Sequence, residues 1–140
     1  MNVQSIINYC LGLSYYSLEN YAGKNYKKVY DHMAKNYDGE KVNTLLRGSI
    51  YTCVAADGKF SDGENKFISS FIGGYTYDEA FDVAAQFYND EAQKIVSQLY
   101  AMFPSDIKEA FVGLCIAVLA VDKRIADYEK QFLNKIVHQA

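Results

Sequence analysis

Residues 50–72 read IYTCVAADGKFSDGENKFISSFI, and residues 115–137 read CIAVLAVDKRIADYEKQFLNKIV. Placed against each other at an offset of 65 positions, the two stretches share the pattern D-x-[KR]-[FI]-x-D-x-E. In each copy an apolar run precedes the acidic pattern, and apolar residues at helical spacing follow it. The repetition therefore predicts two copies of one helix–turn–helix unit.

The apolar positions that the two copies share predict the core of the domain. They recur at spacings of seven, eight and four or five residues, which place them on one inner helix face. They are Phe60, Phe67, Ile68 and Ile72 in the first copy and Ile125, Phe132, Leu133 and Val137 in the second. We therefore expect Phe67 and Phe132 to be buried at equivalent places.

The rest of the chain predicts helices and no strands. No segment shows sustained alternation of apolar and polar residues, and the boundaries take the form of helix caps, such as the capping box from Thr76 to Glu79. The expected helices cover residues 2–20, 24–36, 40–56, 62–72, 77–88, 90–102, 106–121 and 126–138.

The sequence thus predicts an all-α fold, a single-domain helical bundle of about seven or eight helices with an internal pseudo-twofold helix–turn–helix repeat. The domain covers residues 1–140. We expect an N-terminal helical extension, residues 1–38, ahead of a repeat-containing core, residues 40–139.

The distribution of charge argues against a nucleic-acid partner. The formal net charge of −3 divides into +2 over residues 1–53, with six Lys and Arg against four Asp and Glu, and −5 over residues 54–140, with eight against thirteen. An acidic body binds phosphates poorly, because affinity for nucleic acid comes mainly from Lys and Arg.

The cysteines and the apolar runs indicate a cytoplasmic protein. The three cysteines are odd in number, far apart and embedded in apolar runs, which is typical of buried free thiols: Cys10, Cys53 and Cys115. The longest apolar run, residues 110–121, is too short to span a bilayer and predicts a buried core helix. The first residues lack the pattern of a secretory signal.

The acidic pattern between the paired helices has two interpretations. It is no EF-hand, because a calcium loop that starts at Asp57 needs oxygen donors at its third and fifth places, glycine at the sixth and glutamate at the twelfth. Those places hold Lys59, Ser61, Asp62 and Ile68. In one interpretation Ser61 and Glu64 form a capping box, and Lys59 and Arg124 pair with the acids.

In the other interpretation the acids bind a cation. Asp57 follows the negative end of a helix, where a carboxylate is disfavoured unless it accepts hydrogen bonds or meets a cation. In the second copy Ala126 replaces the capping serine, yet Asp122 and Glu129 are both present. Both interpretations stay open at this point.

The motif AADGKFSDGENKFI, with its looser second copy LAVDKRIADYEKQFL, resembles the tellurite-resistance TerB-like family over roughly residues 40–139. The resemblance implies a single helical domain with internal pseudo-symmetry, a role in tellurite and other chemical stress, and metal binding at the acidic turns. The motif acids fall on Asp57 and Glu64 in the first copy and on Asp122 and Glu129 in the second.

We predict that the first turn is the better site for a divalent cation such as calcium, manganese or magnesium. Its ligands would be Asp57 and Glu64, assisted by Asp62, whereas the weaker second turn would use Asp122 and Glu129. Gly58 lets the chain bend freely near an ion, while Lys123 at the matching place adds a side chain and a positive charge.

A stripe of tyrosines in residues 21–37 is a candidate surface for a partner. Tyr26, Tyr30 and Tyr37 share a helical face and are flanked by lysines. Such a stripe either packs on the domain or docks a partner protein or an anionic membrane face, as in a membrane-associated stress complex.

No residues indicate catalysis, because His32 and His138 are far apart and no nucleophile or phosphate-binding motif is present. We therefore expect a non-enzymatic, cytoplasmic stress-response protein that binds a divalent cation or a partner through its acidic turns. The alternative is a structural or adaptor domain without a metal, in which the acids only cap helices.

Overall fold

The computed structural model describes residues 1–54, 60–72, 78–79, 82–83, 86 and 89–139. Within these residues the chain forms seven helices and no strand, which confirms the prediction of an all-α bundle. The helices are α1 (Val3–Leu11), α2 (Tyr15–Met33), α3 (Gly39–Val54), α4 (Asp62–Ser69), α6 (Asp90–Ala101), α7 (Ser105–Ala120) and α8 (Asp127–Gln139).

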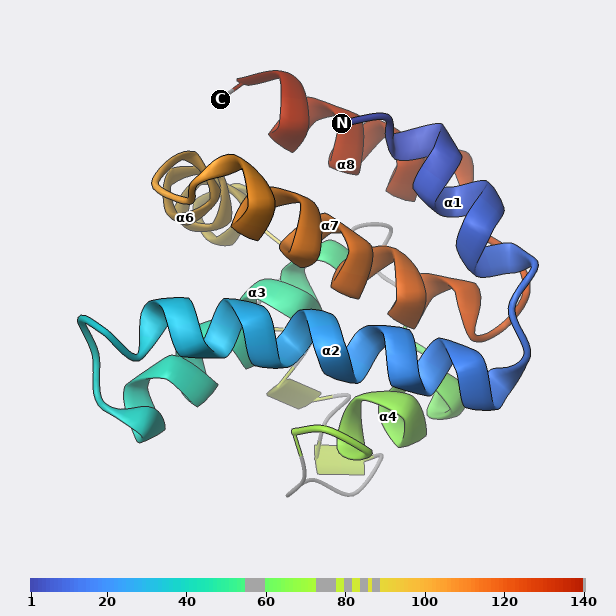
Figure 1. Cartoon of the computed structure of the whole chain (residues 1–140), viewed down its shortest axis with the longest axis horizontal. Coiled ribbons are helices and arrows are strands. Elements are labelled where there is room, and N and C mark those ends of the chain that lie inside the picture. Colours follow the sequence, from blue (N-terminus) through green and yellow to red (C-terminus); the bar gives the residue numbers. More distant parts are fainter. Residues whose placement is uncertain (55–59, 73–77, 80–81, 84–85, 87–88, 140) are drawn as a thin grey trace.

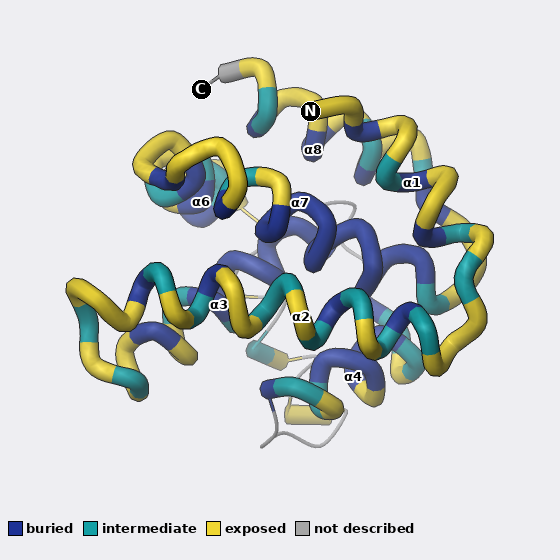
Figure 2. Tube along the Cα trace, in the orientation of Figure 1, coloured by how far each residue is buried: buried dark blue, intermediate teal, exposed yellow. Residues whose placement is uncertain are grey.

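The helix α7 forms the centre of the bundle. Every residue of α7 from Ala110 to Ala120 is buried, and Figure 2 shows the helix dark along this length. The helices α1, α2, α3 and α4 all contact α7, and in Figure 1 α1 and α8 lie on one side of it and α2 on the other. A helix that is apolar on all sides is expected to be buried in this way, so the prediction of a core helix over residues 110–121 is confirmed except at its last residue, the half-buried Val121.

A glycine brings α2 close to α7. A Cβ atom at Gly113 of α7 would overlap the hydroxyl of Tyr21 and would lie 2.8 Å from Nδ2 of Asn25, both on α2. Leu18, Ala22 and Val29 of α2 are buried at this contact or near it. Residues 1–38, which we expected to form an N-terminal extension, therefore pack as part of the same core.

The boundary between the first two helices was predicted wrongly. The chain breaks at residues 12–14, and α2 then continues without interruption through Gly23. Ser14 starts α2 because its side chain accepts the backbone N–H of Ser17 at 3.2 Å. The expected break near residues 21–23 does not occur, since Gly23 is tolerated inside a helix whose neighbour Ala22 is buried.

The predicted core is largely confirmed. Buried positions include Phe60, Phe67, Ile68, Ile72, Ile125, Phe132 and Leu133, whereas Val137 is only half-buried. The three cysteines are free and buried, as expected. The predicted helix over residues 77–88 and the cap residue Thr76 lie wholly or mostly outside the described residues. No described helix is long and apolar enough to cross a membrane.

Candidate functional site

The first acidic turn starts α4 with a complete capping box. The side chain of Ser61 accepts the backbone N–H of Glu64 at 3.0 Å, and Oε1 of Glu64 accepts the backbone N–H of Ser61 at 2.8 Å. These two bonds satisfy two of the N–H groups that a helix start leaves unpaired. The capping interpretation of Ser61 and Glu64 is therefore correct as a description of their local bonds.

The second turn keeps the glutamate half of this arrangement. Oε1 of Glu129 accepts the backbone N–H of Ala126 at 2.9 Å, which matches the Glu64–Ser61 bond at the offset of 65 residues. Ala126 has no hydroxyl, so the second bond of the box is absent. The retained glutamate thus has a local role in the turn that does not require a capping serine.

Beyond the glutamate bond, the two helix–turn–helix units differ in the length of their second helix. The helix α4 has 8 residues, whereas α8 has 13. Residues 55–59 of the first turn, which include Asp57, Gly58 and Lys59, lie outside the described residues. The prediction that residues 45–72 superpose on residues 110–137 therefore stays a prediction.

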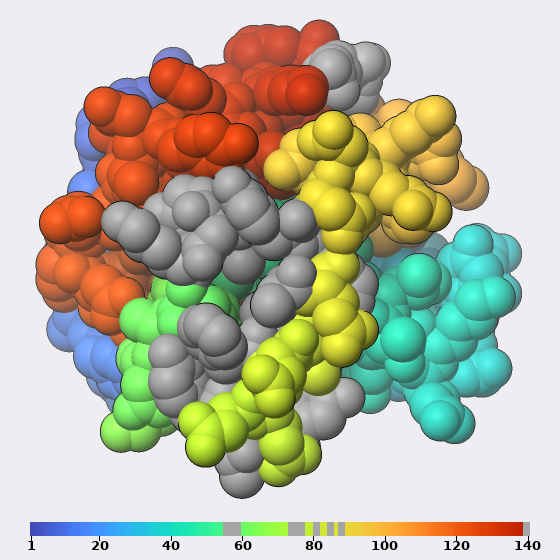
Figure 3. All heavy atoms as spheres, turned by 180° about the vertical axis from the view of Figure 1, so that it is seen from behind, coloured from blue at the N-terminus to red at the C-terminus, as the bar shows by residue number. Residues whose placement is uncertain are grey.

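The two turns lie next to each other and are joined by a hydrogen bond. The hydroxyl of Ser61 donates to Oδ2 of Asp122 at 2.7 Å. A Cβ atom at Gly63 would lie 2.9 Å from Oδ1 of Asp122, so this carboxylate rests against the first turn of α4. The positive end of the α4 dipole favours a negative charge at this place. From behind, atoms of α4 lie beside those of the segment between α7 and α8 (Figure 3).

A pocket of about 360 Å³ opens between the two turns. Its walls combine three acids with one arginine, two apolar side chains and the two residues that precede α4 and α8: Glu64, Asp122, Glu129, Arg124, Phe60, Leu119, Ser61 and Ala126. Glu64 and Glu129 are only 6% and 7% exposed. Two carboxyl groups from different halves of the chain are therefore buried in the wall of one pocket.

The pKa of Glu64 is raised from 4.5 to about 8, mainly by burial and to a smaller extent by the negative charges of Glu129 and Asp122. Hydrogen bonds from Ser61 act in the opposite direction, because they favour the carboxylate form. At neutral pH Glu64 therefore mostly holds a proton.

The remaining predicted ligands are Asp62 and Asp57. Asp62 is exposed and pairs with Lys66 on the next turn of α4, with Oδ2 and Nζ 3.3 Å apart, and it does not line the pocket. Asp57 cannot be placed, because it lies outside the described residues. Among the residues that the structure describes, no group of three or more His, Cys, Asp or Glu is arranged to hold a metal. The expected pairing of Arg124 with an acid is not found within the same residues.

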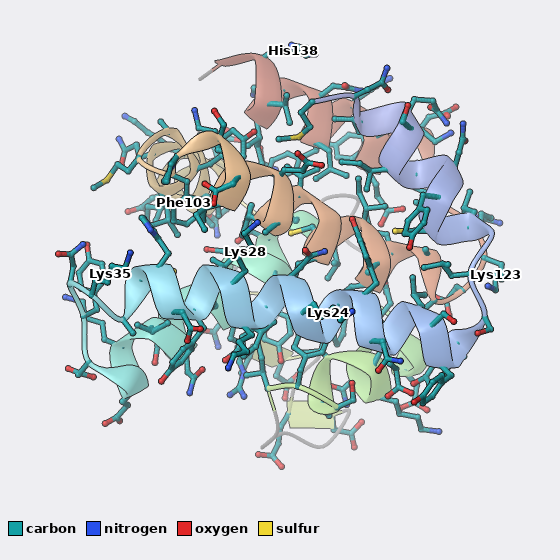
Figure 4. All side chains as sticks on the ribbon, viewed as in Figure 1. Lys24, Lys28, Lys35, Phe103, Lys123 and His138 are labelled. Carbon is teal, nitrogen blue, oxygen red and sulfur yellow. The ribbon has the colours of Figure 1, made fainter. Side chains whose placement is uncertain are left out.

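The predicted tyrosine stripe of residues 21–37, whose last member Tyr37 lies beyond the end of α2, packs against the bundle. Tyr26, Tyr30 and Tyr37 are half-buried, and the hydroxyl of Tyr26 donates to Oδ1 of Asn43 in α3. The ring of Tyr26 lies 5.4 Å from that of Phe71. These contacts use much of the stripe within the domain, so its role in binding a partner stays a prediction. The lysines Lys24 and Lys28 of α2 and Lys35 just after it, by contrast, are exposed at the surface (Figure 4).

Sequence reasoning missed the bridge from Ser61 to Asp122. Its only signal is indirect: two copies of one unit tend to pack as a pair, which brings their turns together. No pattern within either turn names the residue that crosses between them.

No protein-family model, no curated protein and no solved structure matches this chain. The resemblance to the TerB-like family rests on the motif residues alone.

Proposed function

We propose that this protein binds a divalent metal cation in the pocket between its two acidic turns. The observation that carries the proposal is that Glu64, Glu129 and Asp122, from two distant parts of the chain, line one pocket. In the described structure these three carboxylates are not arranged as the ligands of one ion, so binding requires them to reorient. The proposal replaces two separate sites, one for each turn, with a single shared site.

The chemistry of the pocket fits a hard cation. Calcium and magnesium bind oxygen ligands, and carboxylates, hydroxyls and water supply them. A cation between Glu64 and Glu129 would offset the repulsion that helps to keep Glu64 protonated. The charge of Arg124 and the proton on Glu64 both oppose binding, so we expect weak affinity that increases with pH.

Asp57 remains part of the proposal as a ligand predicted from the motif. The TerB-like resemblance adds a role in chemical stress, and this role is likewise a proposal. The cation would then act by fixing the two halves of the domain against each other rather than by chemistry on a substrate.

Calorimetric titration with calcium and with manganese at pH 8 tests the proposal. We expect about one ion per chain, and we expect Glu64→Gln and Glu129→Gln each to remove most of the heat of binding. Both substitutions keep the oxygen that accepts the backbone N–H, so the turns should stay folded. Asp62→Asn is the matched control, because Asp62 is an acid of the same turn outside the pocket.

A structural role is the second candidate, since each glutamate already accepts a backbone N–H at a helix start. In that case the wild type would bind no cation, and the two glutamine variants would change only the free energy of unfolding. Binding that both glutamine variants leave intact would also contradict the shared site.

A further inference from the structure

The side chain of Lys123 leaves the acidic turn and reaches the connection between α1 and α2. Its Nζ donates to the backbone oxygen of Leu13 at 2.6 Å, across 110 residues of sequence. Figure 4 shows Lys123 beside this connection. We call residues 12–15 the N-terminal corner.

The direction of Lys123 is unusual for its place in the turn. Its neighbours Asp122 and Arg124 both line the pocket, but Lys123 does not. Its backbone has φ of 59°, a left-handed conformation that costs free energy for any residue with a Cβ atom. Lys123 thus has a left-handed backbone, and its ammonium is bound at the N-terminal corner and outside the pocket.

A second contact ties the N-terminal corner to α4, the helix that follows the first turn. The ring of Tyr15 packs edge-on against the ring of Phe67 in α4, with centroids 5.8 Å apart. The first turn in turn reaches the second through the bond from Ser61 to Asp122. Side-chain contacts therefore link the N-terminal corner to the second turn and to α4, and the start of α4 to the second turn.

We propose that the N-terminal corner regulates the cation pocket by holding the ammonium of Lys123 out of it. This inference rests on the proposed function. A released lysine is flexible and directly follows Asp122 in the chain, so the carboxylates of the pocket would attract it, and it would compete there with a metal as a tethered cation. Because coupling between two sites is reciprocal, cation binding also stabilises the N-terminal corner.

Calcium titration of four chains tests the mechanism: the wild type, Tyr15→Ala, Lys123→Ala and the double variant. Tyr15→Ala loosens the N-terminal corner and should weaken calcium binding about fivefold or more. In the Lys123→Ala background the same substitution should have little effect, because no ammonium remains to enter the pocket. Tyr16→Ala is the control, since Tyr16 is the neighbouring tyrosine and is 73% exposed.

Amide hydrogen exchange supplies the reciprocal measurement. Calcium should slow exchange at residues 12–18 in the wild type and should do so much less in Lys123→Ala. Calcium binding without either effect, or an equal loss from Tyr15→Ala in both backgrounds, would overturn this inference and leave the proposed function standing. Absence of calcium binding in the wild type would overturn both.

Discussion

The two acidic turns occupy matching positions in the sequence, and one difference between them is the hydroxyl of Ser61, where the second turn has Ala126. In both, a buried glutamate accepts the backbone N–H of the residue that precedes the helix. Only the first turn has a serine there, and its hydroxyl both completes the capping box and crosses to Asp122 of the other turn. In each copy the glutamate therefore bonds within its own turn, whereas the serine of the first turn also bonds to the second turn.

The largest expected effect on stability concerns the phenylalanine that the helix after each turn buries in the core. Phe67→Ala and Phe132→Ala should each lower the free energy of unfolding by about 3–5 kcal/mol. Phe67 should be the costlier, because it is fully buried and meets the rings of Tyr15 and Phe71, while Phe132 is 6% exposed and lines a groove between α6 and α8. Urea denaturation measures both losses. A loss below about 1 kcal/mol for Phe132→Ala would show that the second unit does not use this residue as core.

The next effect is a dependence of stability on pH that comes from Glu64. The pKa of Glu64 is about 8 in the folded chain, against 4.5 for an ordinary glutamate, so the folded state holds a proton that the unfolded chain releases between these values. The stabilisation is fully present below about pH 4.5 and is lost as the pH rises through 8, and it amounts to a few kcal/mol.

Glu64→Gln should remove this dependence. The variant should be more stable than the wild type at pH 9 and should show a flatter profile between pH 5 and pH 9 in urea denaturation. Asp62→Asn, an exposed acid in the same turn, should follow the wild type. Parallel profiles for the wild type and Glu64→Gln would contradict the raised pKa.

The smallest effects concern the residue before each helix, which is Ser61 in the first turn and Ala126 in the second. Ser61→Ala should cost about 1 kcal/mol, because it removes the cap and the bond to Asp122. Ala126→Ser should stabilise the chain by about 0.5–1 kcal/mol by completing the box in the second turn. Thermal unfolding measures both. Equal and negligible shifts would mean that neither hydroxyl contributes to the stability of its turn.

Local patterns were sufficient for most of the fold. The apolar spacing around Phe67 and Phe132 identified the core, and the Ser61–Glu64 pattern identified a helix start, because both depend on neighbouring residues. The break between α1 and α2 was missed, since a capping serine at residue 14 and a tolerated glycine at residue 23 outweighed the apparent punctuation.

The candidate site was less accessible to sequence reasoning. Three of the five predicted ligand acids, Glu64, Asp122 and Glu129, line one pocket, whereas the sequence placed them in two independent turns. Their meeting in one pocket depends on how α4 and α8 pack around α7, which is a tertiary property. The side chain of Lys123 points away from the pocket because its ammonium donates to a carbonyl 110 residues away. The expectation that Lys123 adds a positive charge inside the second site therefore does not hold.

The most direct test of the shared site is a crystal of the wild type grown with manganese, with an anomalous difference map. The account predicts a single peak between the turns, within about 2.6 Å of carboxylate oxygens from both Glu64 and Glu129. Two separate peaks, one on each turn, or no peak between these two glutamates at saturating manganese, would contradict it.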